Sequence, residues 1–342
     1  MKINYKAFLK YLFFLALGLF FVWLSVKDLD RAHWLQIKSA VEGGRKWVII
    51  PVIIMLFLSH YVRALRWKLL MEPLDYRPSN FNAFAAVMIG YLVNTGVPRL
   101  GEVFKCSLLA RYEKFKIDKL IGTILIERAV DVISLFIIFM LAVILQGDIF
   151  GQFMMDQLKL FFYDKTGNIS STKLILACSL FVLVMIVFYI ILKRFGHIDI
   201  IAKIKAVIKN ILYGLSSIRY LRHKGLFLLH SILLWSLYLF STYAGLYALK
   251  ETAHLGIAGA ITTLAVGSIG MIITPGGIGA YPLLVAQLIS LYGLDATTTG
   301  TASGWLLWTA QTFIILVGGL TCFALISRYN KKRIAVEIPR SS

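Results

Sequence analysis

Five ionisable side chains lie in stretches of sequence that are otherwise apolar enough for a membrane interior. They are Arg99, Glu102, Glu127, Arg128 and Asp131. A charged group at the centre of a membrane helix costs about 2.5–3.5 kcal/mol, so such groups must face a polar cavity or other protein groups. The planar guanidinium groups of Arg99 and Arg128 match phosphate oxygens and predict a phosphate clamp. The alternative is that they only neutralise the neighbouring carboxylates.

The spacing of three of these residues predicts contacts within one helix. Glu127 and Asp131 are four residues apart and share a helix face, and Arg128 is three residues before Asp131. An internal ion pair is therefore one interpretation. The carboxylates of Glu102, Glu127 and Asp131 can instead carry a proton or a cation through the membrane. Both interpretations remain open at this point.

Clusters of Gly and Pro interrupt two apolar stretches, 81–112 and 257–292. Interrupted apolar segments in matching places of two halves are typical of transporter binding sites. The unpaired backbone N–H groups of such tips, and the helix starts that follow them, can bind an anion, while the glycines also allow tight turns. The candidate substrate-binding residues are Arg99, Gly101, Glu102, Glu127, Arg128, Asp131, Pro275, Gly276, Gly277, Gly279 and Tyr281.

Arg63, Arg66 and Trp67 end an earlier apolar stretch. Basic and Trp residues at such an end typically anchor a helix at the membrane interface, and a lipid head-group contact is the sharper alternative. The His and Cys residues show no metal-ligand spacing, and no nucleotide-binding or hydrolase motif occurs. We therefore expect no catalytic residue, no metal and no cofactor, and we do not expect an ATP-driven pump.

The composition is that of a membrane protein. Of the 342 residues, 59% are hydrophobic and 15% are charged, against roughly 45–50% and 25% in soluble domains. The 36 Lys and Arg residues exceed the 17 Asp and Glu residues, but they sit in short clusters and form no single nucleic-acid-binding face. Runs of 16 to 43 residues without Asp, Glu, Lys or Arg are long enough for helices that cross a membrane. Such runs include 11–26, 47–62, 132–147, 174–192, 226–249, 252–294 and 296–327.

Charge counting predicts how the chain crosses the membrane. If each interrupted stretch enters and leaves by one face, 26 basic residues lie on the cytoplasmic side, nine lie outside and Arg128 lies within a span. This distribution follows the cytoplasmic preference of Lys and Arg. Full crossings would instead place the basic segments 99–119 and 193–225 outside. The predicted spans are 8–26, 46–66, 119–146, 173–193, 226–249 and 300–326.

The predicted fold is thus an all-α integral membrane protein with six spanning helices plus two oppositely oriented re-entrant helical hairpins, with eight spanning helices as the alternative. Residues 89–94 align with 269–274, and Gly101 aligns with Gly279 after a two-residue gap. These similarities predict an inverted repeat with halves 81–146 and 257–326, within a single polytopic membrane domain over 1–342. Segment 194–225 is typical of a cytoplasmic amphipathic connector, or of a plain solvated one.

Four motifs, in this order, resemble the lysylphosphatidylglycerol synthase transmembrane-region family, whose members are also described as flippase-like domain proteins. The resemblance covers about residues 8–326 and implies an inner-membrane lipid flippase module. Because the chain stops at Ser342, we expect it to lack the soluble aminoacyl-transferase domain of the full synthases. Many relatives carry a Glu after the second tip, where this chain has Ala280 and Tyr281, so the resemblance does not imply a carboxylate mechanism in both halves. The motifs are 62–67, 98–102, Glu127-Arg128-x-x-Asp131 and 275–279.

The expected function is the movement of an anionic or phosphate-bearing lipid between leaflets of the cell membrane, with both termini cytoplasmic. The lipid would be a phospholipid or a polyprenyl-phosphate-type lipid. One alternative is an intramembrane transferase acting on a lipid phosphate, and another is a non-transporting membrane partner of a cell-envelope enzyme. A separately encoded lipid-modifying enzyme is an expected partner, and nucleic acid is not.

Overall fold

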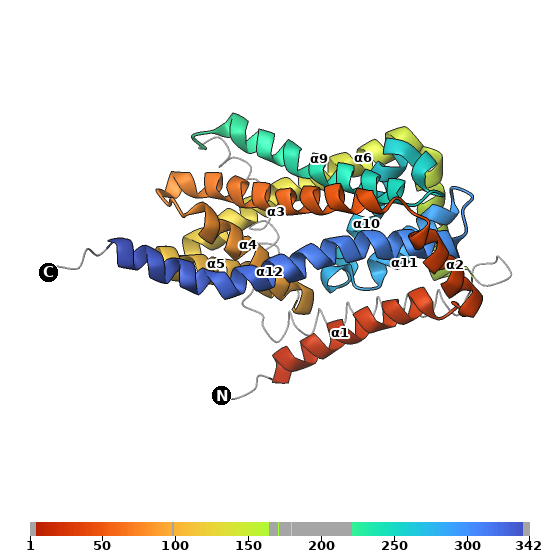
Figure 1. Cartoon of the computed structure of the whole chain (residues 1–342), viewed down its shortest axis with the longest axis horizontal. Coiled ribbons are helices and arrows are strands. Elements are labelled where there is room, and N and C mark those ends of the chain that lie inside the picture. Colours follow the sequence, from red (N-terminus) through yellow and green to blue (C-terminus); the bar gives the residue numbers. More distant parts are fainter. Residues whose placement is uncertain (1–4, 98, 164–169, 171–178, 180–220, 338–342) are drawn as a thin grey trace.

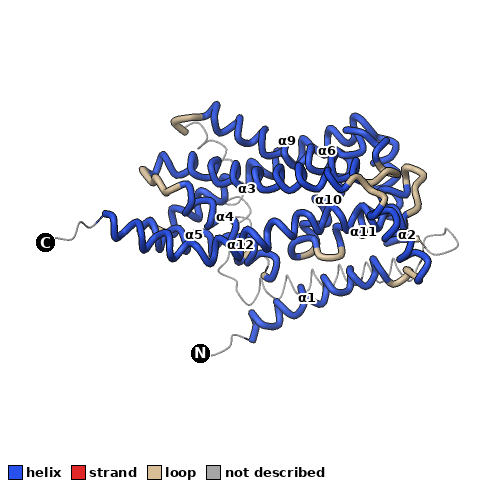
Figure 2. The backbone as a smooth tube through the Cα atoms, viewed as in Figure 1, coloured by secondary structure: helices blue, strands red, loops and turns tan. Residues whose placement is uncertain are grey.

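The computed structural model describes residues 5–97, 99–163, 170, 179 and 221–337. Within these ranges the fold is helical and contains no β-strand, as Figure 2 shows. The longer helices run along the long axis of the molecule (Figure 1). The described helices are α1 Tyr5–Val26, α2 Arg31–Glu42, α3 Ile49–Met71, α4 Asn80–Gly96, α5 Leu100–Glu113, α6 Ile117–Phe162, α9 Lys224–Ala248, α10 Gly256–Ile273, α11 Ala280–Ser290 and α12 Thr301–Glu337.

The prediction of an all-α membrane protein is confirmed. Five described helical segments are long and apolar enough to cross a membrane, and shorter apolar helices occur at Ala16–Val26 and Ala280–Ser290. The predicted span 173–193 and the connector 194–225 lie almost wholly outside the described residues, so the number of crossings stays a prediction. The five segments are Lys46–Leu74, Ile117–Lys159, Lys224–Ala248, Ala253–Ile273 and Ala296–Lys331.

Helices α4 and α5 form a hairpin whose two ends lie side by side. The hydroxyl oxygen of Ser79 caps α4 by accepting a hydrogen bond from the N–H of Asn82 at 3.1 Å. Just before α4, the ring of Tyr76 stacks on Phe115, which follows α5, with ring centroids 4.1 Å apart. The N–H of Lys116 also donates to the Tyr76 hydroxyl at 3.2 Å. The chain therefore enters and leaves this hairpin at the same end of the molecule.

Helices α10 and α11 form a second hairpin with the same property. Lys250 and Glu251, which precede α10, line one surface pocket together with Thr298 and Thr299, which follow α11. In Figure 1 this hairpin lies towards the end that carries α2, whereas the α4–α5 hairpin lies towards the end that carries the C-terminus. The two hairpins thus enter the bundle from opposite ends. Their re-entrant position in a bilayer stays a prediction.

The tips of the two hairpins meet inside the bundle. A Cβ placed on Gly276 would lie 3.4 Å from Cγ2 of Thr95, so the second tip packs directly on α4. The indole N–H of Trp308 on α12 donates to the carbonyl oxygen of Gly276 at 2.8 Å. Gly276 has φ 60°, a left-handed conformation that glycine adopts without steric cost. A tight glycine turn therefore brings the two hairpins into contact.

The first helix of each hairpin is central. All residues of α4 from Asn82 to Gly90 are buried, and so are all residues of α10 from Gly259 to Gly267. A helix buried on all sides belongs to the interior of a bundle. By contrast, α6 exposes large apolar side chains such as Val132, Phe136 and Ile144, which suit contact with lipid tails. The first helices of the two hairpins thus occupy equivalent buried positions.

Close backbone packing also repeats between the hairpins. A Cβ on Gly90 would lie 3.0 Å from the carbonyl oxygen of Gly101, and a Cβ on Gly270 would lie 2.6 Å from Cα of Tyr281. The two residues of each pair are separated by the same number of positions in the sequence. In the structure, Gly101 therefore corresponds to Tyr281, whereas the sequence alignment paired Gly101 with Gly279. This correspondence needs no gap because the paired residues are equally spaced, although 97–99 separate α4 from α5 and 274–279 separate α10 from α11.

Glu113 ties α5 to α4 and α12 at the end of the first hairpin. Its carboxylate accepts hydrogen bonds from the N–H of Ser79 at 2.9 Å, from the Asn82 amide at 2.7 Å and from Arg333 at 3.0 Å. Burial by itself raises the pKa of Glu113, but these donors outweigh it and hold the pKa below its ordinary value of 4.5. This contact lies outside the apolar spans.

Candidate functional site

Two basic residues of α3 face two acidic residues of α6. Arg63 and Arg66 are three residues apart on α3, and Glu127 and Asp131 are four apart on α6, so each pair shares a helix face. Arg63 Nη1 donates to Glu127 Oε1 at 3.0 Å and to Asp131 Oδ2 at 2.6 Å. Arg66 Nη2 donates to Asp131 Oδ1 at 2.6 Å. These four side chains are at most 13% exposed.

Lys105 of α5 completes the surroundings of Glu127. Its Nζ donates to Glu127 Oε2 at 2.8 Å and lies 4.3 Å from the ring centroid of Trp67. Trp67 is itself held in place, because its indole N–H donates to the hydroxyl of Thr123 at 2.8 Å. Glu127 therefore accepts hydrogen bonds from two helices and is 1% exposed.

Arg128 and Glu102 form the accessible edge of the same group. Arg128 Nη2 lies 2.7 Å from Glu102 Oε1, and Arg128 Nη1 lies 3.9 Å from Asp131 Oδ2. The side chains of Arg128 and Glu102 are 41% and 29% exposed. We call these residues the ion cluster: Arg63, Arg66, Lys105, Arg128, Glu102, Glu127 and Asp131.

The ion cluster is internally neutralised except for one positive charge, because it holds four cations and three carboxylates. Glu127 and Asp131 each contact at least two cations. This geometry favours ion pairing over the alternative in which these carboxylates are open to a transported proton. Buried ion pairs add little net stability compared with apolar side chains, so their presence at membrane depth is a reason to look for a function.

A cavity of about 180 Å³ adjoins the ion cluster. Side chains from α3, α4, α9, α10, α11 and α12 line it, so both hairpins contribute. No Asp, Glu, Lys or Arg is among its lining residues. We call it the polar cavity because most of its lining side chains can form hydrogen bonds, namely His60, Tyr91, Trp235, Tyr238, Ser241, Thr242, Ser268, Tyr281 and Gln311.

Two aromatic residues connect the polar cavity to the ion cluster. Arg63 Nη2 lies 3.5 Å from the hydroxyl of Tyr238, and Arg63 Cζ lies 5.8 Å from the ring centroid of Tyr91. The Tyr91 ring in turn contacts the His60 ring, with centroids 4.9 Å apart. Tyr91, Tyr238 and His60 all line the cavity. A ligand in the polar cavity would therefore lie next to the charged groups.

Two buried nitrogen atoms at the polar cavity make no hydrogen bond within the described part of the chain. They are Nδ1 of His60 and Nε1 of Trp235. His60 is 6% exposed. Buried polar groups in folded proteins almost always have a hydrogen-bond partner, so exceptions ask for an explanation. Both residues line the cavity, so a turn of either ring towards it would let a ligand there bond to these atoms.

The structure places the predicted tip residues around the meeting point of the hairpins. Arg99 is exposed in the left-handed conformation at the first tip, and no ion pair of Arg99 occurs among the described residues. The N–H of Gly101 donates to Asn94 Oδ1 at 2.8 Å, which leaves it unavailable to an anion. Pro275 and Gly277 are buried, whereas Tyr281 lines the polar cavity. Gly279 packs against α1, since its Cβ would lie 2.3 Å from the backbone nitrogen of Val22.

Arg63, Arg66 and Trp67 are buried inside the bundle, and their position at the membrane interface stays a prediction. They are 5%, 0% and 0% exposed, and they pack in or against the ion cluster. The physical reason is the pair of carboxylates on α6, which draws both guanidinium groups inward. Sequence reasoning missed Lys105, although a basic residue three positions after Glu102 in an apolar stretch was a usable signal.

The fold and site define a multi-pass, all-α membrane protein in which two opposed hairpins and their neighbours enclose a polar cavity beside a buried ion cluster. The chain belongs to the family described as the lysylphosphatidylglycerol synthase TM region, whose match covers residues 9–319. This confirms the resemblance carried by the four sequence motifs. Membership of this family relates the chain to proteins of membrane-lipid metabolism or lipid flipping.

One relative shows how much of the chain can be aligned with a known protein. A UPF0104 membrane protein from Methanocaldococcus jannaschii is 29% identical over 111 residues. That match covers 32% of this chain and 32% of the relative, so the two are aligned over about a third of their lengths. No solved structure significantly matches the chain.

Proposed function

We propose that this protein moves a phosphate-bearing lipid between the leaflets of the cell membrane, with both of its termini cytoplasmic. The observation that carries the proposal is the polar cavity next to the ion cluster, at the point where two opposed hairpins meet. A lipid head group needs such a polar route because the hydrocarbon core offers it no hydrogen bonds. The family supports the same class of function.

Arg128 is the residue best suited to receive the lipid phosphate. Arg63 and Lys105 are buried and already bonded to carboxylates, whereas Arg128 is 41% exposed and bonded to the partly exposed Glu102. A phosphate can replace the Glu102 carboxylate at the guanidinium group, since both anions accept two parallel N–H bonds. Arg99 supplies a second exposed cation near the tip of the first hairpin. The net positive charge of the ion cluster attracts an anion.

The contacts of the two buried carboxylates support transport over an intramembrane group transfer that would use them. A general acid or base must lie within hydrogen-bond reach of the proton that it moves. Glu127 and Asp131 instead have their oxygens bonded to Arg63, Arg66 and Lys105. We therefore propose a transporter without a catalytic residue. It would work on a phospholipid or a polyprenyl-phosphate-type lipid, beside a separately encoded lipid-modifying enzyme.

The test is leaflet exchange in proteoliposomes that contain the purified protein. Fluorescent phosphatidylglycerol is added to the outer leaflet. At successive times dithionite quenches the label that is still in that leaflet, and the remaining fluorescence measures the lipid that has moved to the inner leaflet. The double variant Arg99→Ala with Arg128→Ala should slow exchange at least about tenfold, since each charge-assisted hydrogen bond contributes about 1.5–3 kcal/mol. Arg111→Ala is the matched control, because Arg111 is exposed on α5 and forms no part of the ion cluster.

Three results decide between the candidate functions. Absence of exchange for phosphatidylglycerol and for a labelled polyprenyl phosphate would reject transport, as would full activity in the double variant. A new lipid product, found by mass spectrometry after incubation, would establish the transferase instead. Exchange that depends on Arg128 and leaves the lipid unchanged would support the proposal.

A further inference from the structure

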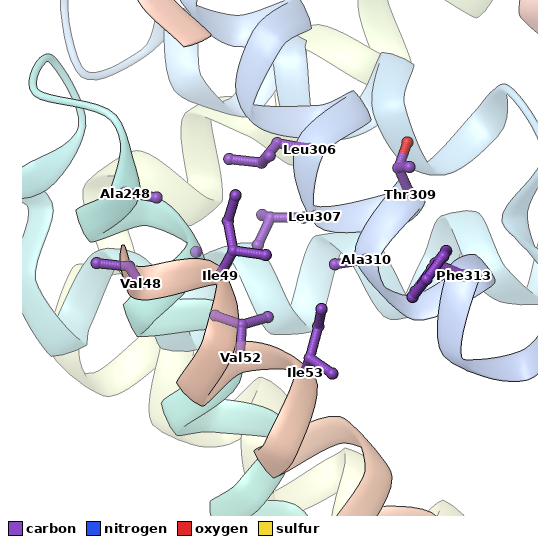
Figure 3. Close-up of a pocket in the computed structure, with 11 residues that line it drawn as sticks. Val48, Ile49, Val52, Ile53, Ala248, Leu306, Leu307, Thr309, Ala310 and Phe313 are labelled. Atoms are coloured by element: carbon purple, nitrogen blue, oxygen red, sulfur yellow. The ribbon is translucent and has the colours of Figure 1, made fainter. Parts of the chain in front are cut away.

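A second cavity, lined almost entirely by apolar side chains, lies between α3, α9 and α12. Its volume is about 310 Å³. Figure 3 shows Ile49 and Ile53 of α3 facing Leu307 and Ala310 of α12 across it. We call this cavity the apolar pocket, and its lining residues are Val48, Ile49, Val52, Ile53, Gly245, Ala248, Leu306, Leu307, Thr309, Ala310 and Phe313.

The apolar pocket and the polar cavity follow one another along the same three helices. On α3, Val52 of the pocket is one turn from Leu56 of the cavity. On α9, Gly245 lines the pocket and Thr242 lines the cavity. On α12, Ala310 lines the pocket and Gln311 lines the cavity. The seam between α3, α9 and α12 thus changes from apolar to polar within one helical turn, and the ion cluster follows at Arg63.

The outer side of the apolar pocket is continuous with the apolar surface of the bundle. Ile49 is 44% exposed and Phe313 is 49% exposed, and both line the pocket. Beyond Phe313, α12 exposes Leu316, Val317 and Leu320. In a membrane this surface faces hydrocarbon chains, so a lipid tail can enter the pocket without crossing a polar layer.

The lining of the polar cavity selects the chemistry of what enters it. The hydroxyl groups of Ser241, Thr242 and Ser268 donate to backbone carbonyl oxygens of their own helices, so towards a ligand they act as acceptors. The Gln311 amide and the nitrogens of His60 and Trp235 add further hydrogen-bonding groups. The absence of Asp, Glu, Lys and Arg from this lining disfavours a charged head group at this position. Aromatic rings of Tyr91, Tyr238 and Trp235 offer flat apolar faces to carbon-bound hydrogens. This combination fits a glycerol or sugar unit.

We propose that the apolar pocket and the polar cavity form one binding site for a single lipid. One hydrocarbon chain occupies the apolar pocket, and the uncharged, hydroxyl-bearing part of the head group occupies the polar cavity. The phosphate that joins the two parts would lie where the pocket meets the cavity, beside Thr242 of α9 and Gln311 of α12. The inference deepens the proposed function and rests on it only for the claim that this lipid is the one transported.

Photo-cross-linking with phosphatidylglycerol that carries a diazirine in its acyl chain tests the site. The purified protein in liposomes is irradiated, and labelled peptides are identified by mass spectrometry. We expect label on α3 around Ile49 and on α12 around Phe313. Unlabelled phosphatidylglycerol should compete about tenfold better than phosphatidic acid, because phosphatidic acid lacks the hydroxyl-bearing unit and about two hydrogen bonds.

Two kinds of variant separate the parts of the proposal. Ala310→Trp should fill the apolar pocket and remove most of the label, whereas Val317→Trp on the lipid-facing side of α12 should leave it unchanged. Trp235→Phe keeps an aromatic ring but removes the indole N–H, so it should abolish about half of the preference for phosphatidylglycerol on a logarithmic scale. Trp34→Phe is its control, because Trp34 is 52% exposed on α2.

The outcomes also distinguish this inference from the proposed function. Label that maps elsewhere, or that survives in a folded Ala310→Trp protein, overturns the tail site. Equal competition by phosphatidic acid, or a preference unchanged in Trp235→Phe, overturns the head-group site. Pocket-specific label in a protein that shows no leaflet exchange supports the binding site and rejects only transport. Exchange without pocket-specific label rejects the binding site and leaves transport standing.

Discussion

Replacing Glu127 by Gln should destabilise the protein strongly. The change keeps the size of the side chain but removes a charge that lies 3.0 Å from Arg63 Nη1 and 2.8 Å from Lys105 Nζ. At an effective dielectric constant of about 20, each such pair attracts by about 5 kcal/mol before desolvation is counted. Breaking a buried pair from one side leaves an uncompensated charge and costs about 3–5 kcal/mol. The formal charge of the ion cluster would rise from +1 to +2.

The assay is thermal unfolding of the purified protein in one detergent. For Glu127→Gln we expect the midpoint temperature to fall by on the order of 10 °C, from about 2–4 °C for each kcal/mol. Glu42→Gln is the matched control, because Glu42 pairs with Lys38 at 3.8 Å on the surface, where both side chains are more than 60% exposed. Such a surface pair contributes about 0–1 kcal/mol.

A double variant tests the cause of the loss. Lys105→Met removes the cation that Glu127→Gln leaves without its partner, so the combination should recover part of the lost stability. The reasoning is refuted if Glu127→Gln behaves like Glu42→Gln. It is also refuted if the midpoint temperature of the double variant falls by the full sum of the decreases that the two single variants show.

Two further predictions concern pH and topology. Because the pKa of Glu113 is held below 4.5, its ionised form adds stability above that pH, and this contribution is lost as the pH falls. In thermal unfolding, the midpoint temperature should therefore fall less steeply with decreasing pH in Glu113→Gln than in the parent protein. Equal slopes in the two proteins would contradict this. In a protein whose three native cysteines are replaced by Ser, Arg77→Cys and Lys114→Cys should react with an impermeant maleimide from the cytoplasmic side, and Lys250→Cys from outside. Labelling of Arg77→Cys and Lys114→Cys from different sides would reject the re-entrant hairpin.

Much of the helical framework could be predicted from the sequence, because a membrane helix requires a long run of residues without charges. The two Gly and Pro clusters also marked the hairpin turns correctly, since α4 ends at Gly96 and α10 ends at Ile273. Both signals are local, so they do not depend on which helix packs against which. The number of crossings stays a prediction, because the segment 173–193 lies almost wholly outside the described residues.

The candidate site could be predicted only where helix periodicity set the geometry. The shared face of Glu127 and Asp131 follows from their spacing, but the spacing does not reveal which helix that face meets. Arg63 and Arg66 at the end of an apolar run match the pattern of interface anchors, and only tertiary packing shows that they point inward. The free nitrogen of His60 is likewise a property of packing, because a lone His carries no spacing signal.

The two hairpins share a backbone arrangement but divide the chemistry between them. In α5, Glu102 and Lys105 follow the first tip and enter the ion cluster, whereas α11 contains no Asp, Glu, Lys or Arg. At the position that corresponds to Gly101, the second hairpin has Tyr281, which lines the polar cavity. The first hairpin thus contributes charged side chains to the ion cluster, and the second contributes uncharged side chains to the polar cavity.

This division is consistent with the predicted topology. Arg63, Arg66 and Lys105 were counted with the cytoplasmic segments but are buried in the ion cluster. Without them, 23 basic residues remain on the cytoplasmic side against nine outside, so the preference persists. In that predicted topology the first hairpin would open to the cytoplasmic side, where the ion cluster would attract the anionic head group that we propose. A lipid that moves outward would exchange these charged contacts for hydrogen bonds in the polar cavity, with its tail against α3 and α12.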